Sequence, residues 1–146
     1  MSNISPYVYR KTIPFGDTDA AAIVYTPRFS DYCMEAAECW FRDYIDFDWY
    51  YVNTCLGMGT PVVHMHIDFV APLKGGDKLG VVVRVAKFGR SSLTLDFEGL
   101  RESDDGGQYH CFSGRFVFCF TSAKTGTSVP VPEQQREFIR SYCAAC

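Results

Sequence analysis

Two aspartates in a short loop are the residues of this sequence best placed to do chemistry. Asp17 and Asp19 precede Thr26 and Pro27, where a strongly patterned helix is predicted to begin. A carboxylate is ordinarily ionised at neutral pH, so it can attack an activated carbonyl group or take a proton from water. The unpaired N–H groups and the positive dipole end at a helix start stabilise a developing oxyanion. The loop is therefore a candidate active site.

This chemistry suits a thioester better than an amide. An amide nitrogen must be protonated before it leaves, whereas a thiolate leaves readily. The ordinary alternative is that both aspartates only satisfy backbone N–H groups in a turn near the helix start. The combination favours a functional loop, because the apolar residues 23–25 between the aspartates and the helix can anchor it.

A possible metal site competes with this loop. His64, His66 and Asp68 alternate along a predicted strand, so their side chains share one face. A metal-dependent hydrolase would need further ligands, and the remaining histidine, His110, lies on a different predicted strand. We expect no metal, although a hydrolase built on these residues stays open as an alternative. The sequence has no G-x-S-x-G elbow and no glycine-rich phosphate loop.

The seven cysteines are scattered and are expected to be free thiols rather than a disulfide framework. Cys143 and Cys146 have the spacing of a redox or metal pair, but two cysteines alone cannot complete a tetrahedral zinc site. We assign this pair no function.

The composition indicates one globular domain over residues 1–146. With 47% hydrophobic residues and a net charge of −3, the chain can bury a core and lacks the basic face of nucleic-acid binders. No signal peptide or membrane-length apolar run is present, which predicts a cytoplasmic protein that binds neither membranes nor nucleic acid. We expect no metal or redox cofactor.

A helix must stand directly behind the loop. Apolar residues recur at spacings of three and four over Arg28–Tyr44, which predicts an amphipathic helix. Thr26 suits its N-cap and Pro27 its first position. A first strand is predicted at residues 7–15, a loop at 46–59 and a short terminal helix at 133–142.

Alternation of apolar residues predicts four further strands. Their apolar positions are Val63 to Phe69, Leu79 to Val85, Leu93 to Phe97, and Phe112 to Phe120. Glycine-containing turns separate them, so antiparallel pairing is expected. One apolar helix face and one apolar sheet face must cover each other, which gives a two-layer α+β domain. Unpaired strand edges predict self-association.

The loop residues 15–19, followed by Ile23, Val24, Tyr25 and Pro27, resemble the active-site signature of the hot-dog-fold acyl-CoA thioesterases, above all the 4-hydroxybenzoyl-CoA thioesterase branch. The likeness continues through residues 59–63 and 129–132 and covers nearly the whole chain. It implies a hot-dog fold, in which a long central helix is wrapped by a curved antiparallel sheet, and a homodimer or homotetramer with active sites near subunit interfaces.

By this likeness Asp19 is the nucleophile or general base, the Thr26 N–H polarises the thioester carbonyl, and Asp17 supports them. The substrate-binding residues implied by the resemblance are Tyr25, Lys87, Arg90 and Ser91. The last three lie near a turn of the kind with which the family binds coenzyme A phosphates, often across subunits.

The implied reaction is hydrolysis of an acyl-CoA, such as 4-hydroxybenzoyl-CoA, to the free acid and coenzyme A. A sister branch that acts on short aliphatic acyl-CoAs commonly has His where this chain has Thr26, so Thr26 favours an aromatic acyl group. The family usually has Pro and Gly at the positions of Ala20 and Ala22, which leaves the detailed path of the loop open. A short-chain thioesterase and a non-catalytic acyl-CoA or acyl-carrier binding protein remain alternatives.

Overall fold

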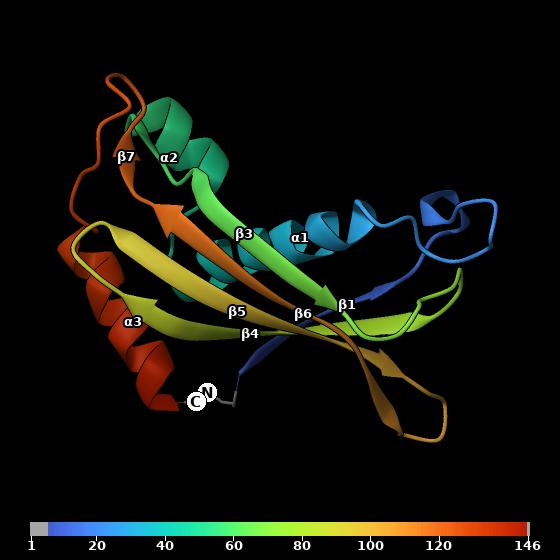
Figure 1. Cartoon of the computed structure of the whole chain (residues 1–146). Coiled ribbons are helices and arrows are strands. Elements are labelled where there is room, and N and C mark those ends of the chain that lie inside the picture. The colour runs from blue at the N-terminus through green and yellow to red at the C-terminus, as the bar shows by residue number, and fades with distance from the viewer. Residues whose placement is uncertain (1–5, 146) are drawn as a thin grey trace.

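A long helix lies along the concave side of a curved antiparallel sheet (Figure 1). The computed structural model describes residues 6–145, so Cys146 of the C-terminal cysteine pair lies outside the described residues. In chain order the elements are β1 (Tyr7–Thr12), the 3-10 turn η1 (Phe15–Asp17), α1 (Arg28–Tyr44), α2 (Trp49–Cys55), β2 (Met58–Gly59), β3 (Val62–Phe69), β4 (Lys78–Phe88), β5 (Ser92–Glu102), β6 (Gln108–Cys119), β7 (Thr121–Ser122) and α3 (Glu133–Ala145).

Within residues 6–145, the main sheet has five strands in the order β1-β4-β5-β6-β3, and all neighbouring strands are antiparallel. Strands β2 and β7 form a small separate ladder. The strands β1 and β3 are the two edges of the main sheet. The predicted α+β hot-dog architecture, with a long helix wrapped by a curved antiparallel sheet, is confirmed.

Helix α1 has the predicted bounds, and its apolar face forms the centre of the core. The buried residues of this face are Phe29, Tyr32, Cys33, Ala36, Ala37, Trp40 and Phe41. They pack on the inward-facing residues of β4, β5 and β6, and the ring of Phe41 lies 5.2 Å from that of Phe118. Each large apolar side chain buried in this way contributes about 1.5–3 kcal/mol. The core therefore fixes α1, and with it the loop that precedes α1.

The predicted loop at residues 46–59 is wrong, because it contains helix α2. Asp48 caps this helix: its carboxylate accepts hydrogen bonds from the N–H groups of Tyr50 and Tyr51, at 2.9 and 3.3 Å. The helix ends at Cys55, and Gly57 follows its C-cap Leu56 with a left-handed φ of 65°. Its seven residues are mostly aromatic, β-branched or short polar types of weak helix propensity, so no repeat revealed it.

Other boundaries also differ from the predictions. Helix α3 begins at Glu133 as predicted but ends at Ala145 instead of residue 142. Strand β1 ends at Thr12 instead of residue 15, because Pro14 leads into the 3-10 turn η1. The N-cap of α1 is Pro27 rather than Thr26, and no side chain caps the helix. No helix among the described residues is long and apolar enough to cross a membrane.

Candidate active site

The predicted active-site loop folds as a miniature β-hairpin between Asp17 and Tyr25. Its base is closed by the Tyr25 N–H, which donates to the Asp17 carbonyl oxygen at 2.9 Å. Nearer the tip, the Asp19 N–H donates to the Ile23 carbonyl oxygen, also at 2.9 Å. The hairpin thus places Asp19 at the start of its tip and Thr26 directly after its base.

The second arm of this hairpin is fastened to the segment that precedes β4. The Val24 N–H donates to the Leu73 carbonyl oxygen at 2.8 Å, and Ile23 forms a β-bridge with Lys74. The Val24 side chain is buried, whereas Tyr25 is 55% exposed. The predicted anchoring of the loop is therefore carried mainly by Val24, and Tyr25 faces outward, where a ligand or a second subunit can reach it.

The tip of the hairpin has an unusual alanine. The Ala22 N–H donates to the Asp19 carbonyl oxygen at 2.9 Å, and the φ of Ala22 is 64°. A three-residue hairpin loop that ends in a left-handed residue normally has glycine there. This left-handed conformation costs an L-residue about 1–2 kcal/mol. Ala22 thus follows a glycine-type path at a conformational cost.

We expect Ala22→Gly to raise the free energy of unfolding by about 0.5–1 kcal/mol, because relief of the left-handed strain exceeds the entropic cost of glycine. Ala21→Gly is the matched control, since Ala21 has no positive φ and should lose about 0.5–1 kcal/mol. Urea unfolding of both variants measures the difference. Equal destabilisation by the two glycines would contradict the strain at Ala22.

Asp19 is exposed, and only one of its two carboxylate oxygens accepts a hydrogen bond within residues 6–145. One carboxylate oxygen, Oδ1, accepts a hydrogen bond from the Ala21 N–H at 2.8 Å. Among residues 6–145, the other oxygen has no hydrogen-bond partner. A carboxylate that is oriented by its own turn and keeps one oxygen open can act as a nucleophile or as a base.

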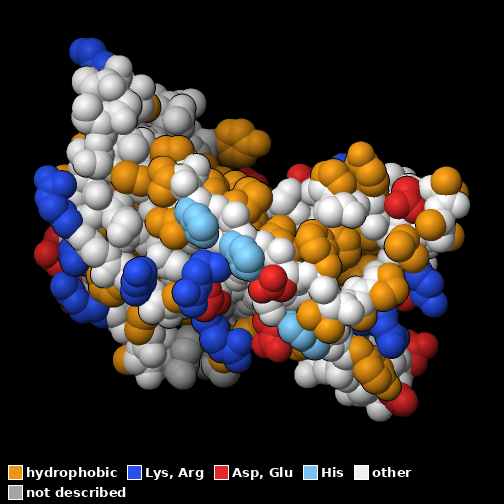
Figure 2. Space-filling model, in the orientation of Figure 1, with side chains coloured by type: hydrophobic (Ala, Val, Ile, Leu, Met, Phe, Trp, Pro, Cys, Tyr) orange, Lys and Arg blue, Asp and Glu red, His pale blue; other side chains and the backbone are white. Residues whose placement is uncertain are grey.

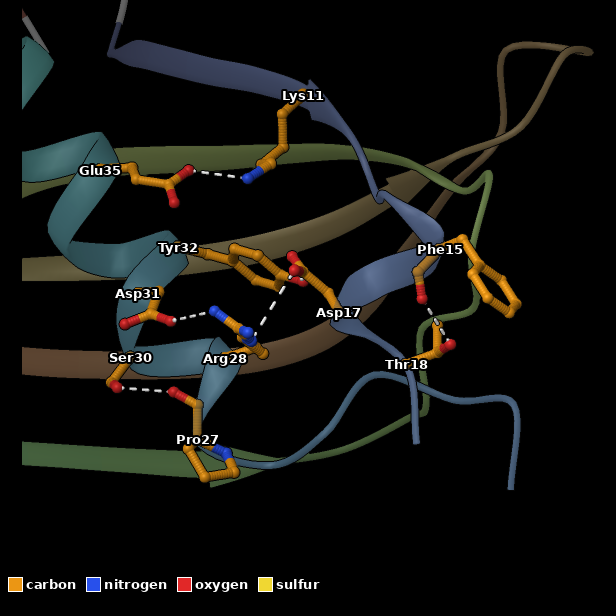
Figure 3. Close-up of polar contacts among 10 residues, drawn as sticks. All are labelled: Lys11, Phe15, Asp17, Thr18, Pro27, Arg28, Ser30, Asp31, Tyr32 and Glu35. Atoms are coloured by element: carbon orange, nitrogen blue, oxygen red, sulfur yellow. Dashed lines mark hydrogen bonds and ion pairs between the residues drawn. The ribbon is translucent and has the colours of Figure 1, made fainter. Parts of the chain in front are cut away.

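Asp17 has the opposite character, because its carboxylate is largely covered and bound on both sides (Figure 3). The Tyr32 hydroxyl donates to Asp17 Oδ2 at 2.8 Å. Arg28 Nε lies 3.7 Å from Asp17 Oδ1, and Arg28 also pairs with Asp31. Sequence reasoning placed Tyr32 on the apolar face of α1 and gave Arg28 no role. Their spacing of four residues at the helix start, next to Asp17, was the available signal.

The backbone at the start of α1 offers one open donor. The Arg28 N–H donates to the Tyr25 carbonyl oxygen at 2.8 Å, and the Phe29 N–H donates to that of Thr26 at 3.2 Å. Within the described part of the chain, the Thr26 N–H has no acceptor, and Pro27 has no N–H to offer. An unpaired N–H at the positive end of a helix dipole is suited to an oxyanion.

The predicted coenzyme A residues lie at the other end of the subunit. Lys87 lies near the end of β4, and Arg90 and Ser91 lie in the turn that follows, whereas the hairpin lies near the start of α1 (Figure 1). The turn is held by α3, since Arg136 Nη1 donates to the Gly89 carbonyl oxygen at 2.9 Å. Both Lys87 and Arg90 are exposed, and neither forms an ion pair within residues 6–145. One subunit alone therefore does not bring them to Asp19.

The three predicted metal ligands lie on the outer face of the sheet, where they line a shallow hollow. Histidine side chains are visible on the surface of the molecule in Figure 2. His66 Nε2 lies 3.1 Å from Asp68 Oδ2, and His64 is near them on the same strand. The shallow hollow beside them also contains Arg115, which is paired with Asp96 at 2.6 Å. Among the described residues, no three His, Cys, Asp or Glu side chains are grouped closely enough to hold a metal ion.

The chain is similar to several known proteins. A family model described as the thioesterase-like superfamily matches residues 13–139. A 1,4-dihydroxy-2-naphthoyl-CoA hydrolase from a Picosynechococcus species is 33% identical over 103 residues, which are 68% of this chain and 67% of that protein.

Two solved structures show the same fold. A thioesterase superfamily protein from Jannaschia sp. CCS1 is 29% identical, with a TM-score of 0.83 over 94% of this chain and 92% of that one. The 4-hydroxybenzoyl-CoA thioesterase from Pseudomonas sp. strain CBS-3 is 21% identical, with a TM-score of 0.83 over 90% of this chain and 97% of that one. At that identity, the second likeness concerns the fold alone.

Proposed function

The chain belongs to the thioesterase-like superfamily, and we propose that it hydrolyses an acyl-CoA thioester to the free acid and coenzyme A. The observation that carries this proposal is Asp19, whose carboxylate is oriented at the hairpin tip and keeps one oxygen open. The unpaired Thr26 N–H at the start of α1 supports it. The relative at 33% identity is named as a hydrolase of an aromatic acyl-CoA.

In the reaction, Asp19 acts on the thioester carbonyl carbon. As a general base, it takes a proton from water while the water oxygen attacks that carbon. As a nucleophile, it attacks that carbon itself and, once the C–S bond has broken, remains joined to the acyl group as an anhydride that water then cleaves. In both routes the Thr26 N–H donates to the developing oxyanion. In the base route the C–S bond breaks after water has attacked, and in the nucleophile route it breaks as the anhydride forms. In both, coenzyme A leaves as the thiolate, which takes up a proton. No metal or redox cofactor takes part.

We propose an aromatic acyl group, such as 4-hydroxybenzoyl or a dihydroxynaphthoyl group. A recess of about 360 Å³ between α1, α2 and the start of β3, the end of β3 that pairing with a second copy would bring toward the partner's hairpin, supports this choice. Its walls include Met34, Trp49, Val52 and Met58, which are flat or flexible apolar side chains. A short aliphatic acyl group would leave much of such a recess unfilled. The cytoplasmic location stays a prediction.

The activity is tested by thiol release from benzoyl-, 4-hydroxybenzoyl-, 1,4-dihydroxy-2-naphthoyl- and acetyl-CoA, with and without a chelator. We expect turnover of the aromatic substrates with kcat/KM at least about tenfold above that of acetyl-CoA, and no effect of the chelator. Loss of activity with the chelator would support a metal site at His64, His66 and Asp68 instead. Binding of acyl-CoA without turnover of any thioester would favour a non-catalytic binding protein.

We further propose that the protein is a homodimer joined through β3, with a tetramer as the next level of assembly. Among residues 6–145, nothing pairs with the outer edge of β3. Its apolar residues Val63, Met65 and Phe69 are 48–62% exposed, which is unfavourable for an edge that stays in water. A second copy of β3 would cover them.

A two-fold antiparallel pairing of β3 would also complete the site. Phe69, at the end of β3, packs on Phe29 at the start of α1, with ring centroids 5.1 Å apart, so the hairpin lies at this end. The start of β3 lies at the opposite end, beside the turn that carries Lys87 and Arg90. Antiparallel pairing places the start of one strand against the end of the other. The basic turn of one subunit would then approach Asp19 of the partner.

Met65→Lys is expected to convert the assembly into monomers, because two lysines would face each other near the centre of the paired edges. Analytical ultracentrifugation measures the change, with Tyr50→Lys as the control, since Tyr50 is 77% exposed and belongs to α2 rather than to the edge strand. Shared sites are tested by mixing Asp19→Asn with the Lys87→Ala/Arg90→Ala double variant under conditions that exchange subunits. Recovered activity supports the shared site, and no recovery from a dimeric mixture argues against it.

A further inference from the structure

A chain of polar side chains lies beneath the hairpin and joins it to α1 and β1 (Figure 3). The Tyr32 hydroxyl donates to Asp17 at 2.8 Å. Lys11 Nζ stands 4.9 Å from the centre of the Tyr32 ring and forms an ion pair of 2.9 Å with Glu35. The Tyr9 hydroxyl donates to the same Glu35 carboxylate at 2.7 Å. Two tyrosine–carboxylate bonds of nearly equal length therefore stand side by side, and only one of them touches the hairpin.

The surroundings of Tyr32 keep its hydroxyl protonated, so that it donates a hydrogen bond to Asp17. Its side chain has no exposed surface, because the ring packs in the core next to Phe29. Burial, followed by the hydrogen bond to Asp17 and the negative charge of that carboxylate, raises the pKa of the Tyr32 hydroxyl far above its usual range. The hydroxyl therefore keeps its proton at neutral pH, and that proton is directed at Asp17.

Asp17 connects Tyr32 to the part of the hairpin that carries Asp19 and leads to Thr26. Its side chain is held by α1 through Tyr32, while its carbonyl oxygen accepts the Tyr25 N–H that closes the hairpin. Asp19 is two residues away on one arm, and Thr26 follows directly after the other arm. A shift of Asp17 would therefore move the carboxylate and the oxyanion donor relative to each other.

We propose that Tyr32 is a positioning residue for catalysis: through Asp17 it fixes the hairpin on α1 and thereby sets the placement of Asp19 against the Thr26 N–H. This inference rests on the thioesterase function proposed above. Arg28 is a weaker second restraint, because its contact with Asp17 is 3.7 Å long, is partly exposed and is shared with Asp31. Tyr32 carries the restraint because its hydrogen bond is short and shielded from water.

Tyr32→Phe tests this role, with Tyr9→Phe as the matched control. Each variant loses one tyrosine hydroxyl that donates a partly buried hydrogen bond to a carboxylate, so the two variants should lose comparable thermal stability. Only Tyr32→Phe is expected to lower kcat, by roughly tenfold to a hundredfold, with KM changed less than about threefold. In the Asp17→Ala background, Tyr32→Phe should have no further effect on kcat, because its effect is transmitted through that carboxylate.

Hydrogen exchange separates this inference from the proposed function. Tyr32→Phe should speed exchange of the Asp19, Ala22 and Tyr25 amides, whose hydrogen bonds build the hairpin, and Tyr9→Phe should not. If the wild-type protein hydrolyses no thioester, the proposed function fails, and exchange still decides whether Tyr32 holds the hairpin. Unchanged kcat in Tyr32→Phe of an active enzyme, or equal losses of kcat in both variants, would overturn the positioning role.

Discussion

Asp19→Asn is expected to lower kcat for thioester hydrolysis by a factor on the order of 10²–10⁴. The substitution is nearly isosteric, and the amide oxygen of Asn can still accept the hydrogen bond that the Ala21 N–H donates to Asp19 at 2.8 Å. The hairpin should therefore keep its shape. The amide has no negative charge, however, so it can neither attack the carbonyl carbon nor take a proton from water. Stopped assays of thiol release under saturating acyl-CoA measure the loss.

Asp17→Asn is the control that separates charge from position. Its side-chain oxygen can still accept from the Tyr32 hydroxyl, while the ion pair with Arg28 is lost. We expect a decrease in kcat of no more than about tenfold, since an exposed ion pair contributes only about 0–1 kcal/mol. Full activity in Asp19→Asn together with an inactive Asp17→Asn would reverse the roles assigned to the two aspartates.

Long regular elements were predictable because their patterns repeat many times. Helix α1 repeats its apolar spacing over 17 residues, and its predicted bounds are those observed. Strands β4, β5 and β6 are 11 or 12 residues long, and apolar residues alternate over enough of each strand to predict its inward face. Helix α2 has seven residues, and its start depends on a single capping carboxylate, Asp48. Such a local hydrogen bond does not appear in any periodicity.

The location of the candidate site was predictable, but its geometry was not. A loop with two carboxylates before a helix start indicated where to look, and the resemblance selected Asp19. Two features that control the geometry depend on the folded backbone: the left-handed φ of Ala22 and the contact between Asp17 and Tyr32. The ring of Tyr32 obeys the apolar pattern of α1, and this concealed the partner of its hydroxyl. An amphipathic side chain can serve the core with its ring and a site with its polar tip.

Substitution of Gly99 should cause the largest loss of stability that we predict. Gly99 lies in β5 opposite Phe112 of β6, at a point where the register of the two strands shifts. The Phe112 ring lies directly over this glycine, so a Cβ at residue 99 would come within 2.0 Å of ring atom Cε1 and 2.3 Å of Cδ1. Phe112 is fully buried and packs edge-on against Phe29, with centroids 5.2 Å apart. The ring has no free space into which it can turn.

Gly99→Ala is therefore expected to lower the free energy of unfolding by about 3 kcal/mol, at the upper end of the usual cost of overpacking a core. Gly59→Ala is the matched control, because a Cβ there meets nothing closer than 3.6 Å and should cost less than about 1 kcal/mol. Urea unfolding followed by near-UV circular dichroism measures both. Similar losses in the two variants would contradict the placement of the Phe112 ring.

If Gly99→Ala is too unstable to purify, the pair Phe112→Leu and Gly99→Ala/Phe112→Leu still tests the contact. A leucine side chain is smaller and more flexible than the ring, so Gly99→Ala should cost less in the Phe112→Leu background than in the wild-type protein, and the double variant should be recovered folded. The same ring supports Phe29, the first buried residue of α1, so its displacement should also loosen the start of that helix. We therefore expect faster amide exchange in the hairpin that carries Asp19 in any folded Gly99→Ala protein. The reason is that Gly99 leaves room for the Phe112 ring, and this ring packs against the start of α1.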